Sequence, residues 1–193
     1  MPPGWKIIDS VLTFKTEQIL EQDYNYKGNR DIMYGEEEFE NFELYLEWKI
    51  PKGGNSGIYY HIKEGYGGFT DMAPEYQLLD DENYAEIHDY ELKDWQLTAA
   101  DYAMHVPDTT QKVLYPPGQW NSSRIIFTPN NVEHWLNDKK VLSFIPWTEQ
   151  WYEKRNSGKW DNFPDYGKYK KGYIGLQDHG SNLWFRNIKI KKL

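Results

Sequence analysis

The sequence predicts an all-β sandwich of two antiparallel sheets joined by long irregular loops. Three observations lead to this prediction. Apolar and polar residues alternate strictly in several short segments, turn residues recur at near-regular spacing, and no segment has the apolar period of an amphipathic helix of three turns. We therefore expect more than about 35% strand, well above the usual 20–25%.

The clearest alternation lies in FELYLEWKI, residues 42–50. Its apolar residues share one face of a half-buried strand, and its polar residues take the other. The segment 51–57, PKGGNSG, supplies the positive-φ residues of a tight connection. We expect residues 57–62 to form the partner strand of a hairpin.

The second half of the chain contains further turn signals. Pro129-Asn130-Asn131 separates two predicted strands at 124–128 and 132–136, and residues 137–140 form the turn into a third at 141–144. Residues 172–193 are predicted to form two short strands joined by a polar turn. The irregular runs 82–116 and 146–171 are long enough to be functional loops or to carry small helices. No repeat or linker divides the chain, so we expect one domain spanning 1–193.

Composition narrows the function. The chain has 33 aromatic residues, made up of 9 Trp, 16 Tyr and 8 Phe. Flat aromatic rings suit the C–H faces of sugars, but Tyr and Trp are also common in sandwich cores, so composition leaves both roles open. A net charge of −8 opposes nucleic-acid binding. The absence of Cys excludes disulfides and a Cys nucleophile, and no apolar run reaches the roughly 18 residues of a membrane span.

Two polar clusters are candidates for a site. Glu75 and Gln77 share a strand face about 7 Å apart, which fits either a ligand-binding face or a solvated edge strand. Gln177-Asp178-His179 stands at the end of a predicted strand, where a core needs no such cluster. The ordinary pKa of His, about 6.5, suits proton transfer near neutrality, but a buried structural role for His179 remains open.

Seven segments, taken in order, resemble the 3-keto-disaccharide hydrolase domain family, and the resemblance extends from residue 4 to residue 193. They are FELYLEWKI (42–50), GGNSGIYY (53–60), PEYQLLDDE (74–82), TAADY (98–102), PPGQWNSSRIIF (116–127), VEHWLNDKKV (132–141) and GLQDHGSNLWFRNIKI (175–190). The resemblance implies a concanavalin A-like jelly roll whose curved face is walled by the long loops. It implies a carbohydrate substrate and cleavage of 3-keto-glycosides or 3-keto-disaccharides. A non-catalytic, lectin-like module on the same face is the alternative.

Glucanases on this fold carry E-x-D-x-E on one strand, but here Gln77 and Leu79 replace the second and third acids. The two carboxylates of retaining hydrolysis are therefore not visible. Proton abstraction at carbon 2 of a 3-keto sugar, followed by elimination and hydration, needs instead a base, an acid and a group that polarises the ketone. The expected catalytic residues are His179, Glu75 and Arg186. The expected substrate-binding residues are Asn55, His61, Gln77, Asp80, Tyr102, Gln177 and Asp178.

Missing sequence motifs decide which cofactors and partners we expect. Its five histidines form no H-E-x-x-H motif, so no metal ligand set is predicted and no cofactor is expected, although a divalent cation held by distant strands remains open. Without a Rossmann fingerprint, the oxidation that makes the 3-keto sugar would belong to a separate sugar 3-dehydrogenase. Members of the resembled family are often exported, so a periplasmic or extracellular location is expected, although residues 1–4 do not resemble a signal peptide. The sugar, its linkage and the aglycone are not predicted.

Overall fold

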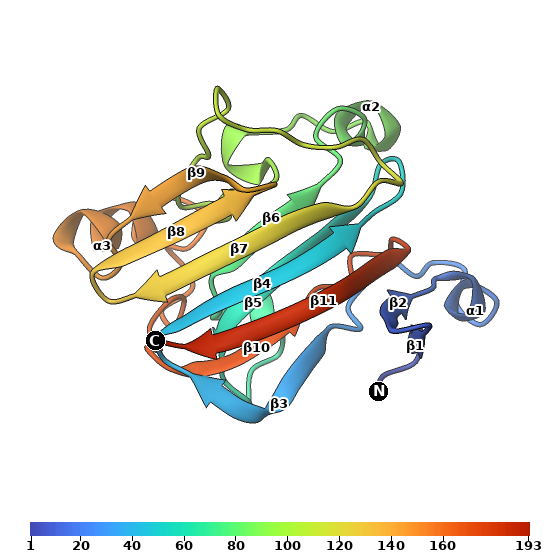
Figure 1. Cartoon of the computed structure of the whole chain (residues 1–193), viewed down its shortest axis with the longest axis horizontal. Helices are drawn as coiled ribbons and strands as arrows, with labels where there is room; N and C mark the ends of the chain where they lie inside the picture. Colours follow the sequence, from blue (N-terminus) through green and yellow to red (C-terminus); the bar gives the residue numbers. More distant parts are fainter.

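Two antiparallel sheets pack face to face in the computed structural model, which describes the backbone of residues 1–193 and every side chain except that of Gln18 (Figure 1). The seven-stranded sheet has the order β1-β2-β11-β4-β7-β8-β9, and the four-stranded sheet has the order β3-β10-β5-β6. The strands are β1 (Trp5–Ile8), β2 (Val11–Phe14), β3 (Ile32–Phe39), β4 (Phe42–Lys49), β5 (Asn55–Ile62), β6 (Glu75–Leu79), β7 (Asn121–Thr128), β8 (Asn131–Leu136), β9 (Lys139–Phe144), β10 (Gly172–Leu176) and β11 (Leu183–Lys192).

The main core fills the space between the two sheets. Strand β4 buries Phe42, Leu44, Leu46 and Trp48 and leaves the alternate residues partly exposed, as the sequence pattern predicts. In contrast, every residue of β5 and β6 is buried. One face of these two strands packs on the core, so segments of the chain outside the two sheets must cover their other face.

The long loops supply that cover. They carry α2 (Tyr84–His88), the 3-10 turn η2 (Asp94–Gln96) and α3 (Glu149–Arg155); α1 (Glu17–Leu20) and η1 (Phe69–Asp71) are the other short helical segments. Figure 1 shows α2 at the top of the view and α3 at its left edge, whereas β1, β2 and α1 lie at the right, below α2. Strands make up 39% of the chain and helices 11%, which confirms the predicted all-β class. Among the described residues, no helix has both the length and the hydropathy needed to cross a membrane.

Two predicted hairpins are wrong. Strand β4 pairs with β11 and β7, whereas β5 pairs with β6 and β10, so the turn at 51–54 carries the chain from one sheet to the other. The C-terminal strands β10 and β11 are likewise in different sheets. Alternation identifies the buried face of a strand but not its neighbours, and both faces of β5 are apolar enough for a covered position in the smaller sheet. The β7–β8 and β8–β9 hairpins are present as predicted.

Candidate active site

A cavity of about 300 Å³ lies on the outer face of the four-stranded sheet, at the lower end of the usual size of small-molecule sites, roughly 300–1,000 Å³. Its floor comes from β5, β6 and the residue that follows β10. The alternation along β5 and β6 turns Ile58, Tyr76 and Leu78 into the main core and leaves Glu75 and Gln77 on the cavity side.

Glu75 is the most buried charged group of this floor. It is 3% exposed, and its Oε1 has no hydrogen-bond partner. Its carboxyl lies directly over Gly57, because a Cβ at that glycine would come within 2.0 Å of Oε1. Glycine at position 57 therefore provides the space that the carboxyl occupies.

Burial raises the pKa of Glu75 to about 8 because the charged form is desolvated. The positive charge of Lys159 and a hydrogen bond from Tyr59 lower the pKa, while the negative charges of Asp31 and Asp101 raise it further. Desolvation is the largest of these effects. The carboxyl is therefore mainly protonated at neutral pH and presents an O–H donor to the cavity.

Amide side chains surround this carboxyl. The Gln177 backbone N–H donates to the Gly57 carbonyl at 2.9 Å, which extends the pairing of β10 and brings the side chain onto the floor. Its Nε2 donates to the Tyr59 hydroxyl at 2.5 Å, and its Oε1 is left without a partner. Gln77 Nε2 donates to Asn55 Oδ1 at 3.3 Å. Buried polar atoms without partners are rare, so the two free oxygens of Glu75 and Gln177 suit the hydroxyls of a ligand.

His179 enters the cavity from the turn after β10. Its side chain is exposed, in contrast to Glu75, yet partial desolvation lowers its pKa, and the positive charges of His88 and Lys159 act in the same direction. A hydrogen bond to its own backbone opposes them. The imidazole is therefore neutral at neutral pH, with one ring nitrogen free to accept a proton.

The wall of the cavity is bonded to its floor. Residues 98–102 pair with the free edge of β6: Ala99 N–H donates to the Gln77 carbonyl at 2.9 Å, and Tyr102 N–H donates to the Glu75 carbonyl at 3.0 Å. Edge strands are otherwise exposed to unwanted pairing, so this segment also protects the sheet. The pairing places the Tyr102 ring beside Glu75.

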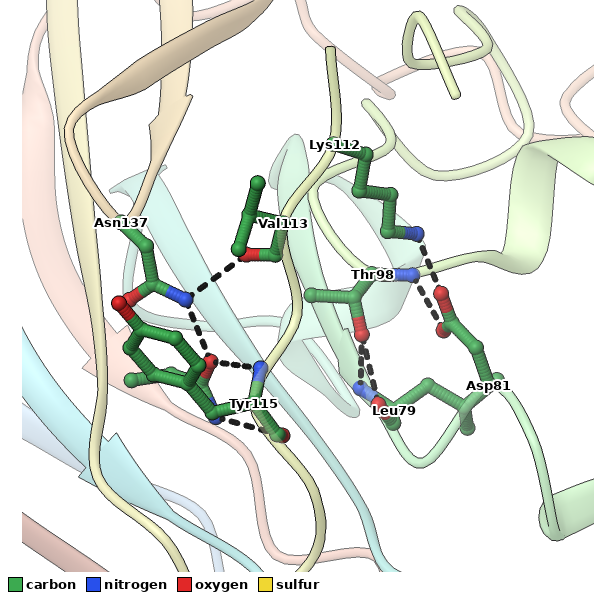
Figure 2. Close-up of polar contacts among 8 residues, drawn as sticks. Leu79, Asp81, Thr98, Lys112, Val113, Tyr115 and Asn137 are labelled. Atoms are coloured by element: carbon green, nitrogen blue, oxygen red, sulfur yellow. Dashed lines mark hydrogen bonds and ion pairs between the residues drawn. The ribbon is translucent and has the colours of Figure 1, made fainter. Parts of the chain in front are cut away.

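Figure 2 shows how this segment is anchored. The Thr98 hydroxyl accepts from Leu79 N–H at 2.8 Å and donates to the Leu79 carbonyl at 2.7 Å. The Thr98 N–H donates to Asp81 Oδ1 at 2.8 Å, and the other oxygen of Asp81 pairs with Lys112. Side chains thus continue the backbone ladder from β6 into the loop.

Sequence reasoning missed most of the wall. Tyr84, Tyr90, Leu92 and Gln96 line the cavity from the loop between β6 and β7, and Lys159 reaches it from the loop before β10. None of them belongs to a periodic pattern. The length of the two loops predicted that they are functional or carry small helices, and the family resemblance implied that they wall a face, but neither identified any of these five residues.

Lys159 is the cation of this cavity. Its Nζ lies 4.1 Å from the centroid of the Tyr102 ring and 4.8 Å from that of Trp160. Desolvation lowers the pKa of Lys159, and the nearby Glu75 opposes this shift. Aromatic faces hold the ammonium where it can meet negative charge that develops on a ligand.

The cavity brings together six of the ten predicted site residues: Asn55, Glu75, Gln77, Tyr102, Gln177 and His179. Arg186 is elsewhere. It lies on β11 in the seven-stranded sheet, where its Nε donates to Glu47 Oε2 at 2.6 Å and its guanidinium stacks 4.0 Å from the centroid of Trp120. The carboxylate partner of Arg186 is thus Glu47, and the expectation that Arg186 belongs to one catalytic site with Glu75 is wrong.

His61 is also absent from the cavity, because β5 contains a bulge. Between the pairs Tyr59–Gly175 and Ile62–Tyr173, β5 has one residue more than β10, and His61 has a φ of +57°. The bulge turns the imidazole into the interior, where it packs 4.5 Å from the Phe127 ring, and desolvation lowers its pKa to about 4.

Asp80 and Asp178 are structural in this arrangement. Asp80 follows the last residue of β6 on the opposite side from Glu75 and accepts from Gly53 N–H at 2.8 Å. Asp178 points away from the cavity and accepts from Arg30 N–H at 3.0 Å and Gly180 N–H at 2.9 Å. No three His, Asp or Glu side chains among the described residues lie close enough together to hold a metal ion.

The two antiparallel sheets form a jelly roll of the concanavalin A-like class of folds, and its outer face carries a cavity lined by amides, a buried carboxyl and aromatic rings. The family follows from direct comparison. The model of the 3-keto-alpha-glucoside-1,2-lyase-like domain matches residues 2–191, and the chain belongs to this family. The family resemblance found in the sequence is confirmed, and so is the expectation of an enzyme of the glycoside-cleaving class.

Three relatives illustrate the relationship. A 3-keto-disaccharide hydrolase from Bacteroides thetaiotaomicron is 35% identical over all of this chain and 71% of its own length. The crystal structure of a proposed glycosyl hydrolase from Parabacteroides distasonis has a TM-score of 0.85 and 43% identity, covering 98% of this chain and 84% of the other. A carbohydrate-binding module from Bacillus subtilis has a TM-score of 0.58 at 10% identity, covering 97% of this chain and 91% of the module, and shares the fold.

Proposed function

We propose that this chain cleaves 3-keto-glycosides or 3-keto-disaccharides by proton abstraction at carbon 2, elimination and hydration. The observation that supports this proposal is that one cavity contains both a protonated, buried Glu75 and a neutral His179. Among the described residues that line the cavity, Glu75 supplies the one carboxyl group. Retaining hydrolysis needs a second carboxyl about 5–5.5 Å away, and elimination does not.

The two pKa shifts assign the roles. A neutral His179 takes the proton from carbon 2, which the neighbouring ketone makes acidic, and an enolate forms. The bond from carbon 1 to the glycosidic oxygen then breaks, and Glu75 donates its proton to the departing oxygen. Water adds across the resulting carbon–carbon double bond, with its hydroxyl on carbon 1 and its proton on carbon 2.

Lys159 is the cationic residue of this scheme, in place of Arg186, which the sequence had indicated as catalytic. Its ammonium stabilises the enolate oxygen, because a fixed cation in a desolvated site lowers the energy of a developing negative charge. The amides of Gln77, Asn55 and Gln177 bind sugar hydroxyls, and the Tyr102 ring stacks on the sugar or its leaving group. Arg186 has no part in this scheme.

The substrate also implies a partner. A ketone at carbon 3 has to be made by an oxidation, so we infer that a sugar 3-dehydrogenase supplies the substrate. We place the reaction in the periplasm or outside the cell, as for exported members of the family.

A lectin-like module is the second candidate, favoured by the shared fold of the carbohydrate-binding module and by the aromatic wall. Glu75 argues against it. A buried carboxyl without a full set of partners destabilises the fold, and a binding site made of amides and rings has no need of one. Proton transfer does need such a group.

The test incubates the protein with a 3-keto-glucoside and with its unoxidised parent, both in D₂O. We expect aglycone release from the keto compound alone, with deuterium at carbon 2 of the product. Glu75→Gln and His179→Ala should each lower turnover on the order of 10²–10⁴-fold, while Arg186→Ala should keep it near the wild-type value. Release from the parent alone would indicate an ordinary glycosidase, and binding of both without release would indicate a lectin.

A further inference from the structure

The turn that carries His179 is tied to the N-terminal segment by a reciprocal pair of acidic residues. Asp31 Oδ1 accepts from the backbone N–H of Asp178 at 2.8 Å, and Asp178 Oδ2 accepts from the backbone N–H of Arg30 at 3.0 Å. The Tyr26 hydroxyl also donates to Asp178 Oδ2. We call the pair Asp31 and Asp178 the aspartate clasp.

Backbone contacts reinforce the clasp. Asn29 N–H donates to the Asp178 carbonyl at 3.0 Å, and Gly180 N–H donates to Asp178 Oδ1 at 2.9 Å. Gly28 has a φ of +114°, and a Cβ there would lie 2.7 Å from the Asp178 carbonyl oxygen. The two segments are therefore in close backbone contact, which another residue at position 28 would disrupt.

One member of the clasp, Asp178, lies in the sequence between two residues that line the cavity. Asp178 directly follows Gln177 and directly precedes His179, so its side chain and backbone fix the residue on each side. Strand β5 also contacts the turn, because Asn55 N–H donates to Ser181 Oγ at 3.2 Å and the Ser56 hydroxyl donates to the Gln177 carbonyl at 2.8 Å. These contacts hold residues 177 and 181, whereas the clasp holds Asp178, the residue next to His179, and so sets the direction from which the His179 ring enters the cavity.

The geometry points to Asp31 as a positioning residue for the reaction: through Asp178 it holds the turn on which His179 acts, and it does not touch the substrate. This inference rests on the proposed function, in which His179 takes a proton. A displacement of a catalytic group by about 1 Å can cost on the order of 10²-fold in rate.

Asp31 also acts through its charge. Its carboxylate raises the pKa of Glu75 and of Tyr59, and burial raises its own pKa to about 6, so it is mainly ionised at neutral pH. It helps Glu75 to keep its proton. The titratable and charged groups around Asp31 are Asp178 from the turn, Tyr26 and Arg30 from the N-terminal segment, Tyr59 from β5 and Glu75 from β6.

Two substitutions separate the contact from the charge. Asp31→Asn keeps an oxygen that accepts from Asp178 N–H but removes the charge, and Asp31→Ala removes both. Asp23→Asn is the matched control, because Asp23 lies in the same segment and is exposed, and the bond described for its carboxylate is a local one from Asn25 N–H.

The first measurement is the NMR titration of the His179 imidazole, which needs no turnover. We expect Asp31→Ala to release the turn, so that the pKa of His179 rises toward its ordinary value of about 6.5, while Asp31→Asn and Asp23→Asn leave it near the wild-type value. An unchanged pKa in Asp31→Ala would overturn the inference.

The second measurement is the pH profile of kcat with a 3-keto-glucoside. Asp31→Ala should lower kcat on the order of 10–100-fold, more than KM changes. Asp31→Asn should retain most of kcat at pH 6 but move the alkaline limb to lower pH by about 0.5–1 unit, because Glu75 loses a negative neighbour. If kcat and the profile match those of Asp23→Asn in both variants, the positioning role is refuted. A wild-type protein that does not turn over the keto compound refutes the proposed function alone, since the titration still tests the clasp.

Discussion

Glu75→Gln should stabilise the folded chain relative to the wild type, by an amount that grows as the pH rises. In the folded chain Glu75 keeps its proton up to about pH 8, whereas in the unfolded chain it ionises near its ordinary value of 4.5. Between these values the folded state binds more protons than the unfolded state, so the free energy of unfolding of the wild type falls with rising pH. Gln carries no such proton.

The size of the effect follows from the shift. Relative to wild type, the gain in the free energy of unfolding should grow by on the order of 3 kcal/mol between pH 5 and pH 8. For a chain of 193 residues, each kcal/mol corresponds to roughly 2–4 °C in Tm. The difference between the two proteins removes the contributions of His61 and His134 to the pH dependence, because both are present in each protein.

Urea unfolding of both proteins at pH 5, 6, 7 and 8 measures this difference, with Glu43→Gln on the partly exposed face of β4 as the matched control. The control should show no growth with pH beyond about 0.5 kcal/mol. A flat difference for Glu75→Gln would mean that Glu75 ionises at an ordinary pKa, and the donor role proposed for it would fall with that result.

Three further predictions concern other positions. Gly57→Ala should push the Glu75 carboxyl out of place and lower turnover by about 10²-fold or more while circular dichroism remains that of a β protein. Arg186→Ala should lower the free energy of unfolding by less than about 1 kcal/mol in urea, because the Arg186 side chain is 40% exposed, and should leave kcat unchanged. Burial lowers the pKa of His134 to about 4, so the stability that its neutral form contributes above about pH 6.5 is lost as the pH falls toward 4. His134→Gln should reduce this loss of the free energy of unfolding by up to about 3 kcal/mol. An unchanged loss in acid would contradict the buried neutral ring.

The period of a strand could be predicted, but its neighbours could not. Alternation in 75–79 identified the shared face of Glu75 and Gln77 correctly, and the same alternation already put Asp80 on the other side. It failed at His61, because a one-residue bulge reverses the faces that follow without leaving a trace in the apolar pattern. Arg186 was assigned to the wrong sheet, since pairing between distant strands has no local signature.

The loop residues of the cavity could not be predicted from the alternation of apolar residues, for a different reason. Lys159 and Tyr84 reach the cavity from segments with no repeating period, and their direction is set by tertiary contacts such as the stacking of Lys159 on Tyr102. The glycine at 57 was a visible clue. Gly in the interior of a strand often marks the close approach of another group, and here that group is Glu75.

The backbone bonds between β6 and residues 98–102 have a consequence for how a ligand enters. Because Ala99 and Tyr102 donate to the strand that carries Glu75, this part of the wall is tied to the edge of the sheet and cannot swing open without breaking these backbone bonds. Amide hydrogens of Ala99 and Tyr102 should exchange as slowly as those of β5, with free energies of opening close to that of global unfolding. The protein would then meet its sugar with a rigid, preformed receptor, and the association rate should depend little on temperature beyond diffusion.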